Sequence, residues 1–307
     1  MGYIISTVNM KGGVGKTTLT VNLAACLAKA YNKKVLVLDL DSQISATLSL
    51  LPPHEFGKLR KNRKTLSYLL DLAVTSNLHS KLPTTDLIIS PLSNLSQLHL
   101  LPGDIELYDE YLISEKLHQQ AIQENKASDF EGVWNNFESL LLQDILKPVV
   151  ANYDFIILDC APGYNILTRS ALAASDFYIL PARPEFLSLV GIQLLERRVR
   201  KLRESHQDNH SLKLQLLGIV FILSQSGLFG RYAKYYEQVK RRIKQDFPPE
   251  KIFLTEIPMD VNVAKAVDAS IPVTIITPDC NASKAFYRLT EEFLQKLTQQ
   301  ATQKQSG

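Results

Sequence analysis

The chain has 307 residues, of which 45% are hydrophobic and 21% are charged, and its formal net charge is +3. This composition is typical of a soluble globular protein with a full core, and the net charge is too small to indicate nucleic-acid binding by itself. No run reaches the roughly 18 apolar residues of a membrane-spanning helix, and the N-terminus resembles a strand rather than a signal peptide. The cysteines Cys26, Cys160 and Cys280 form no C-x-x-C pair, so we expect a reducing, cytoplasmic location.

The first recognisable unit is a strand, a glycine-rich loop and a helix. Residues 3–8 are short and β-branched, as in a buried strand, and residues 19–30 are an unbroken run of helix formers. The loop glycines lack a Cβ, so consecutive backbone N–H groups can surround an anion beside the positive end of the helix. We therefore expect a phosphate-binding loop made of Lys11, Gly12, Gly13, Val14, Gly15, Lys16, Thr17 and Thr18. Lys16 would reach the β- and γ-phosphates of a nucleotide, and the Thr17 hydroxyl would ligate Mg²⁺.

The loop departs from the usual pattern G-x-x-x-x-G-K-[ST], because Met10 occupies the position of the first glycine. It carries a second lysine, Lys11, and in this it resembles the deviant Walker A motif of the ParA/MinD superfamily of ATPases. In that family the extra lysine reaches across a nucleotide-sandwich dimer to the phosphates of the partner subunit. The resemblance implies a homodimeric ATPase that uses ATP and Mg²⁺, with Lys11 and Lys16 as catalytic residues. A glycine-rich turn with incidental lysines is the alternative.

Two further apolar runs end in acids: residues 34–41 in Asp39 and Asp41, and residues 153–159 in Asp159. The stretch around Asp41 resembles the D-L-D-P-Q switch I of the family, with Ser42 in place of proline. That resemblance implies that Asp41 is catalytic, orienting or deprotonating the attacking water near Mg²⁺, and that Asp39 is structural. Asp159 has the position of a Walker B acid that holds Mg²⁺, in a stretch resembling switch II, although a carboxylate there can also cap the next element.

The region between residues 50 and 150 resembles the family only loosely. A basic run at 58–64 is interpreted as a solvated surface, with nucleic-acid contact as the alternative. Further along we expect a helix at 66–72, short strands at 87–89 and 98–101, and a long polar helical region at 105–147.

The remaining chain continues the alternation of strands and helices. Strands are expected at 177–181 and 216–222, a last helix at 283–299, and a frayed polar tail at 298–307. This order predicts an α/β fold, a mostly parallel twisted sheet with helices on both faces, and the resemblance specifies a P-loop NTPase of the SIMIBI type. Ligands of such sheets bind at the carboxyl ends of the strands, so the loop, Asp41 and Asp159 should meet in one site. We interpret residues 1–307 as a single ParA-like ATPase domain.

Two later segments extend the resemblance. Residues 180–192 follow the family pattern P-x-x-P-E-F-x-x-L-x-G, which lies at the dimer face in relatives. Residues 257–266 resemble I-P-R-N-V-R-L-x-E-A, and this similarity implies that Pro258 and Asp260 contact adenine. Met259 and Asn262 replace the two arginines of this pattern that often contact DNA in relatives, which weakens the case for DNA binding.

Two basic clusters, at 196–203 and 231–244, nevertheless favour DNA. If the second cluster is a helix, its apolar stripe would face the core. Its opposite face would then expose four bases that can contact DNA phosphates: Arg231, Lys234, Arg241 and Arg242. A solvated helix face is the alternative. The last helix carries as many acids as bases, whereas a membrane-surface helix needs a basic polar face, so we expect it to pack on the core.

The resemblance implies an ATP-dependent, dimerising ATPase that binds nonspecific DNA and partitions or positions a plasmid, a chromosome or other cargo. A partner protein, ParB-like or another cargo adaptor, would stimulate hydrolysis, and the protein would be nucleoid-associated if it binds DNA. The rival is a ParA/MinD-fold regulatory ATPase that acts on a membrane or protein partner without DNA. A relative like the nitrogenase iron protein needs cysteine ligands between subunits, and the three scattered cysteines argue against it.

Overall fold

A parallel β-sheet forms the centre of the computed structural model, which describes residues 2–75, 82–206, 212–224 and 231–305. The seven strands lie in the order β3-β2-β4-β1-β5-β6-β7, and every pairing between them is parallel. Their bounds are β1 Tyr3–Thr7, β2 Val35–Leu40, β3 Leu98–Leu101, β4 Phe155–Cys160, β5 Phe177–Ala182, β6 Gln215–Ser224 and β7 Ile257–Pro258. The expected α/β fold of the P-loop NTPase type is confirmed.

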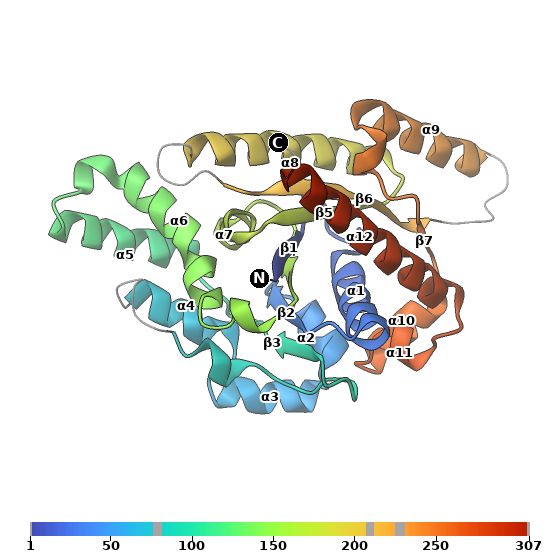
Figure 1. Ribbon diagram of the computed structural model, residues 1–307. Coiled ribbons are helices and arrows are strands. Elements are labelled where there is room, and N and C mark those ends of the chain that lie inside the picture. The colour runs from blue at the N-terminus through green and yellow to red at the C-terminus, as the bar shows by residue number, and fades with distance from the viewer. Residues whose placement is uncertain (1, 76–81, 207–211, 225–230, 306–307) are drawn as a thin grey trace.

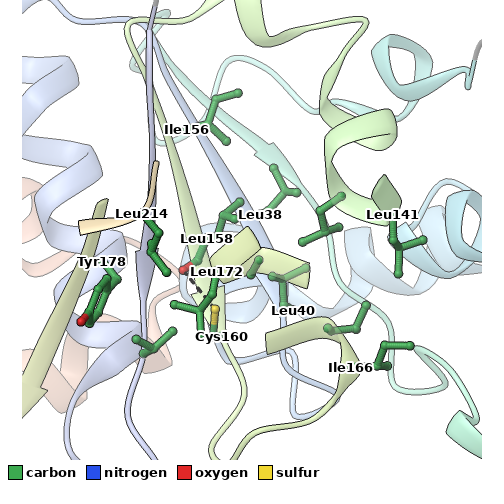
Figure 2. Close-up of a cluster of buried hydrophobic side chains, with 14 of the residues drawn as sticks. Leu38, Leu40, Leu141, Ile156, Leu158, Cys160, Ile166, Leu172, Tyr178 and Leu214 are labelled. Atoms are coloured by element: carbon green, nitrogen blue, oxygen red, sulfur yellow. Dashed lines mark hydrogen bonds between the residues drawn. The ribbon is translucent and has the colours of Figure 1, made fainter. Parts of the chain in front are cut away.

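The central strands are continuous apolar runs because helices cover both faces of the sheet. All residues of β2, β4 and β5 are buried, as expected for parallel strands that never face water. Successive side chains alternate between two cores: Leu36 and Leu38 point into one, and Val35 and Val37 into the other. Figure 2 shows the first core, where Leu38 and Leu158 from the sheet lie close to Leu141 and Leu172 from the covering helices.

Twelve α-helices in the described residues surround this sheet (Figure 1). The helices on the side of Leu36 and Leu38 are α4 Leu66–Thr75, α5 Glu110–Gln123, α6 Phe130–Leu146, α7 Ile166–Ala174, α8 Phe186–Ser205 and α9 Arg231–Asp246. Those on the side of Val35 and Val37 are α1 Lys16–Tyr31, α2 Ser45–Leu50, α3 Pro53–Lys61, α10 Val261–Asp268, α11 Val273–Ile276 and α12 Asn281–Gln305. In the described part of the chain, no helix combines the length and apolar character that crossing a membrane requires.

Three expected elements differ from the structure. The strand expected at 87–89 is wrong: a 3₁₀ turn occupies Thr84–Leu87, and only Ile89 forms a bridge, to Leu100. Pro83 precedes this short run and Pro91 follows it. Because proline has no backbone N–H to donate to a strand ladder, the run cannot extend into a longer strand.

The helical region expected at 105–147 is two helices rather than one. The Asp109 carboxylate accepts hydrogen bonds from two backbone N–H groups and starts α5 there, and Asn125, with a φ of 57°, ends the turn after it. The last helix is longer than expected, because α12 continues through Gln305 into the segment expected to be frayed.

Candidate nucleotide-binding site

The glycine-rich loop joins β1 to α1 at the carboxyl edge of the sheet. Gly13 and Gly15 have φ values of 70° and 89°, in the left-handed region that favours glycine. A Cβ on Gly15 would also approach Cγ2 of Ile222 in β6 to 2.8 Å. Position 15 therefore requires glycine for two independent reasons, and the turn directs the first backbone N–H groups of α1 toward the loop.

A cavity of about 520 Å³ opens above this loop. Its floor contains the expected phosphate-loop residues Gly12, Gly13, Gly15, Lys16, Thr17 and Thr18, and Asp41 and Gln43 lie on one side. Its opposite wall is mostly apolar and comes from a later part of the chain: Val263, Ala266, Val267, Ile271, Pro272 and Val273. One charged end and one apolar wall suit a ligand that combines phosphates with an aromatic base.

Asp159 lies at the end of β4 and is buried beneath this floor. Its carboxylate accepts hydrogen bonds from the hydroxyls of Thr17, at 2.7 Å, and Thr20, at 3.1 Å. Asp41 follows β2 and accepts the backbone N–H of Gln43. The parallel register of β2 and β4 places Asp39 beside Asp159, so the acids that the sequence predicted to converge do lie at one edge of the sheet.

Burial controls the charges of this site. Burial, with a further contribution from Asp39, raises the pKa of Asp159 to about 7. Burial likewise raises the pKa of Asp39 to about 6, although the hydrogen bonds from Thr47 oppose the shift. Burial lowers the pKa of Lys16, and the nearby Asp159 opposes that change. Burial disfavours the charged form of a carboxylate, and a cation bound beside it stabilises that charged form.

These donors fit a nucleotide with Mg²⁺. Hydroxyl and carboxylate oxygens are the ligands that Mg²⁺ prefers, and Thr17, Asp41 and Asp159 supply them here. The Lys16 ammonium lies beside the loop and donates to the backbone carbonyl of Lys11 at 3.2 Å. Val14 is fully buried, so its side chain anchors the loop rather than lining the cavity.

Lys11 points away from the cavity. Its Nζ lies 2.6 Å from Oε2 of Glu185, the residue that precedes α8, and Arg183 is 3.6 Å from the other oxygen of that carboxylate. In the single chain this lysine therefore pairs with a carboxylate and does not line the cavity. The sequence indicated that residues 180–192 belong to a dimer face, but it gave no sign of this ion pair.

Pro258 and Asp260 do not line the cavity. The Asp260 carboxylate caps α10 by accepting the backbone N–H of Asn262, and it also accepts the N–H of Ala282 at the start of α12. Adenine contacts by Pro258 and Asp260 stay a prediction. The apolar wall that follows them was missed in the sequence, although the apolar residues of 261–273 were the available signal.

The bases expected to contact DNA lie on α9, away from the cavity (Figure 1). Lys234, Arg241 and Arg242 are exposed, while Val239 and Ile243 form the buried stripe of the helix. The side chain of Arg231 lies outside the described part of the structure. The neighbouring helix α8 also carries exposed bases: Arg197, Arg198, Arg200 and Lys201.

Comparisons with known proteins agree with this fold. A family model described as an AAA domain matches residues 2–214. The chain is 30% identical over 296 residues to the chromosome-partitioning ATPase Soj of Treponema pallidum, covering 96% of this chain and 98% of that protein. It is 28% identical over 292 residues to the sporulation initiation inhibitor protein Soj of Bacillus subtilis, covering 95% and 98%.

Among solved structures, apo McdA from Cyanothece superposes with a TM-score of 0.70 at 20% identity, covering 96% of this chain and 100% of that chain. The fold similarity and the sequence similarity both extend over nearly the whole length of the relatives. The deviant glycine loop, the acids at the strand ends and these matches lead to one assignment. The chain belongs to the AAA-domain family and is a member of the ParA/MinD superfamily of ATPases.

Proposed function

We propose that the protein is a cytoplasmic, Mg²⁺-dependent, dimerising ATPase that binds nonspecific DNA and partitions or positions cargo, and that a partner protein stimulates its hydrolysis of ATP. The observation that carries the proposal is the convergence of the phosphate loop, Asp41 and Asp159 around one cavity. Two relatives are named as Soj proteins, one of them a chromosome-partitioning ATPase, which supports partition or positioning as the cellular role.

Each residue has a distinct task in this mechanism. The loop N–H groups and Lys16 hold the β- and γ-phosphates and neutralise the charge that develops between them. Thr17, Asp41 and Asp159 would hold Mg²⁺, and the ion would supply further charge neutralisation. Asp41 faces the cavity and orients the attacking water, and hydrolysis yields ADP and phosphate.

Dimerisation completes the site through Lys11. The ion pair with Glu185 shields this lysine in the single chain. Exposed apolar side chains cover the adjoining first turns of α8: Phe186, Leu187, Val190 and Leu194. A second copy would bury this apolar surface and provide phosphates to which Lys11 can transfer from Glu185.

The bases of α8 and α9 provide the surface for DNA. A dimer presents this surface twice, so it would neutralise several phosphates and bind duplexes without sequence preference and with strong salt dependence. Met259 is exposed and Asn262 lies on α10 in place of the family arginines. This difference favours the second candidate, a regulatory ATPase that acts on a protein or membrane partner without DNA.

The test is binding to a nonspecific duplex with ATP, ADP or no nucleotide, over a salt series, with dimerisation measured in parallel. We expect dimerisation and salt-sensitive binding with ATP alone. Replacing Arg241 and Arg242 with Ala should weaken binding and flatten its salt dependence. The matched control replaces Lys58 and Lys61, exposed bases of α3, and should leave binding unchanged. A dimer that forms with ATP but never binds DNA would support the second candidate.

A further inference from the structure

Residue 11 is held in place through three of its groups. Its backbone N–H donates to Oδ1 of Asn9 at 2.9 Å, and its carbonyl accepts from Nζ of Lys16 at 3.2 Å. Its own side-chain Nζ lies 2.6 Å from Oε2 of Glu185. Lys16 has a task in the proposed mechanism, whereas Asn9 has none, although its side chain is only 1% exposed. A buried carboxamide thus supports the loop from inside the protein.

The Asn9 carboxamide uses both of its ends at the point where β1 leaves the sheet. The N–H of Val8 still donates to the carbonyl of Ile179 in β5 at 3.1 Å, as a strand residue does. The carbonyl two residues further along β5 belongs to Pro181, and it accepts from Nδ2 of Asn9 at 2.8 Å. The other end of the carboxamide accepts the Lys11 N–H and forms an Asx turn. The side chain therefore replaces the strand ladder and begins the loop.

Helix α8 closes over this carboxamide at Gly191, which is buried. A Cβ on Gly191 would lie 3.2 Å from Oδ1 of Asn9 and 3.8 Å from Cβ of Met10. The first distance is shorter than an ordinary van der Waals contact, so a methyl group here would displace the carboxamide. The backbone of residue 191 is helical, so this position favours glycine because of the close approach to Asn9.

One short segment, residues 181–191, contacts both the backbone support and the side chain of Lys11. Its two ends contact Asn9, and Glu185 between them contacts the lysine amine. The exposed apolar side chains of α8 that would meet a second subunit begin in the same segment. The surface proposed for dimerisation is thus connected to residue 11 at its backbone as well as at its amine.

We propose that Asn9 is a positioning residue for Lys11, and that Gly191 allows α8 to hold Asn9 in place. This inference rests on the proposed function, because it requires an ATPase in which Lys11 acts on the phosphates. The carboxamide fixes the peptide of residue 11, so the lysine side chain starts from one defined direction. A lysine that starts from several directions reaches the reactive geometry less often, and small misplacements of this kind reduce turnover strongly.

Gly191→Ala is the first test. Alanine has a higher helix propensity than glycine, so the Tm should equal or exceed that of the wild type, while the added methyl displaces the Asn9 carboxamide. We expect kcat to fall about tenfold and the affinity for ADP to change less than about threefold, because the later N–H groups of the loop hold ADP. Gly57→Ala is the matched control, since Gly57 is an exposed residue of α3 where a Cβ meets nothing within 4 Å. It should leave turnover unchanged.

Asn9→Ala removes the carboxamide itself and should lower kcat by about 10–100-fold. With the carboxamide gone, Gly191→Ala has nothing to displace, so the double variant should turn over at the rate of Asn9→Ala alone. Additive losses would show that Gly191 acts through another group and would overturn the proposal. A loss of turnover that follows a loss of Tm in Gly191→Ala would show a merely structural role.

Amide hydrogen exchange at Lys11, measured by NMR on the nucleotide-free protein, tests the hydrogen bond without any turnover. Exchange should be faster in Asn9→Ala and Gly191→Ala than in the wild type and Gly57→Ala. Equal exchange in all four proteins, or faster exchange with unchanged turnover, overturns the positioning role. A wild type without ATP turnover refutes the proposed function instead, while the exchange rates still decide whether Asn9 holds residue 11.

Discussion

Individual carboxylates determine how the nucleotide site works. Asp159 is buried and held by two threonine hydroxyls, whereas Asp41 lines the cavity. The buried acid is suited to hold a metal ion, and the acid at the cavity is suited to act on water. Both predictions at this scale follow from this difference in environment.

Asp41→Ala is expected to retain ATP binding and to lose most turnover, by roughly 10²–10⁴-fold. The loop and Lys16 supply the phosphate contacts, so removal of a carboxylate beside the attacking water should affect kcat more than affinity. Nucleotide binding by fluorescence and phosphate release measure the two effects. Turnover equal to that of the wild type would remove Asp41 from the mechanism.

The pH dependence of stability should reveal the buried acid pair. The pKa of Asp159 is raised to about 7 in the folded protein, against an ordinary value of 3.8. The folded state therefore binds this proton more tightly than the unfolded state, so the contribution of Asp159 to stability is greatest below pH 3.8 and declines as the pH rises toward 7. Asp159→Asn removes the contribution of Asp159, while that of the buried Asp39 remains. The Tm of the variant relative to the nucleotide-free wild type should therefore rise across that window and stay constant above it. Parallel Tm curves for the two proteins would show that the burial of Asp159 has no such effect.

At the scale of elements, helices position the site by packing on the sheet from both sides. The last helix illustrates this, because Phe286, Leu289 and Phe293 of α12 are fully buried. Phe293 contacts Phe155 of β4 with ring centroids 5.7 Å apart. The apolar stripe of α12 is thus occupied by the core, in agreement with the expectation that this helix packs on the protein.

Phe293→Ala should lower the free energy of unfolding by about 3–5 kcal/mol, because it removes a large buried side chain and leaves a cavity. Urea denaturation measures the change. Gln295→Ala, an exposed position of the same helix, serves as the control and should change stability by less than about 0.5 kcal/mol. A small effect of Phe293→Ala would mean that α12 contributes little to the core.

At the scale of the whole molecule, two charged elements lie far apart. Figure 1 shows α9, which carries exposed bases, on one side of the molecule and α5, which belongs to the acidic stretch at residues 104–116, on the other. The dimer proposed here would add a second asymmetry, because each site combines Asp41 of one subunit with Lys11 of the other.

Mixing two inactive variants tests this arrangement. Lys11→Ala and Asp41→Ala should each lose hydrolysis as homodimers. A mixed dimer contains one site with both residues intact, so an equimolar mixture should recover about a quarter of wild-type turnover if subunits pair at random. Phosphate release over a range of mixing ratios measures this, and each variant alone is the control. A mixture as inactive as its components would show that Lys11 acts within its own subunit.

The sequence by itself determined the parallel α/β fold, the strand–loop–helix unit and the convergence of Asp41 and Asp159. These features follow from local patterns, because apolar runs specify buried strands and parallel strands bring their carboxyl ends to one edge. The glycine at position 15 also agrees with its local role, since the residue before α1 has a left-handed backbone conformation, which favours glycine. The strand predicted at 87–89 was wrong, because a short apolar segment becomes a strand only where a neighbouring strand lies in position to pair with it.

Only the tertiary structure decided the contacts between distant segments. Lys11 and Glu185 are 174 residues apart in the chain and form an ion pair. Asp260 caps a helix instead of lining the cavity, and residues 263–273 form the wall in its place. Side-chain periodicity specifies which residues are buried, but the partner of a buried or charged group depends on how helices pack around the sheet, and no local pattern encodes that geometry.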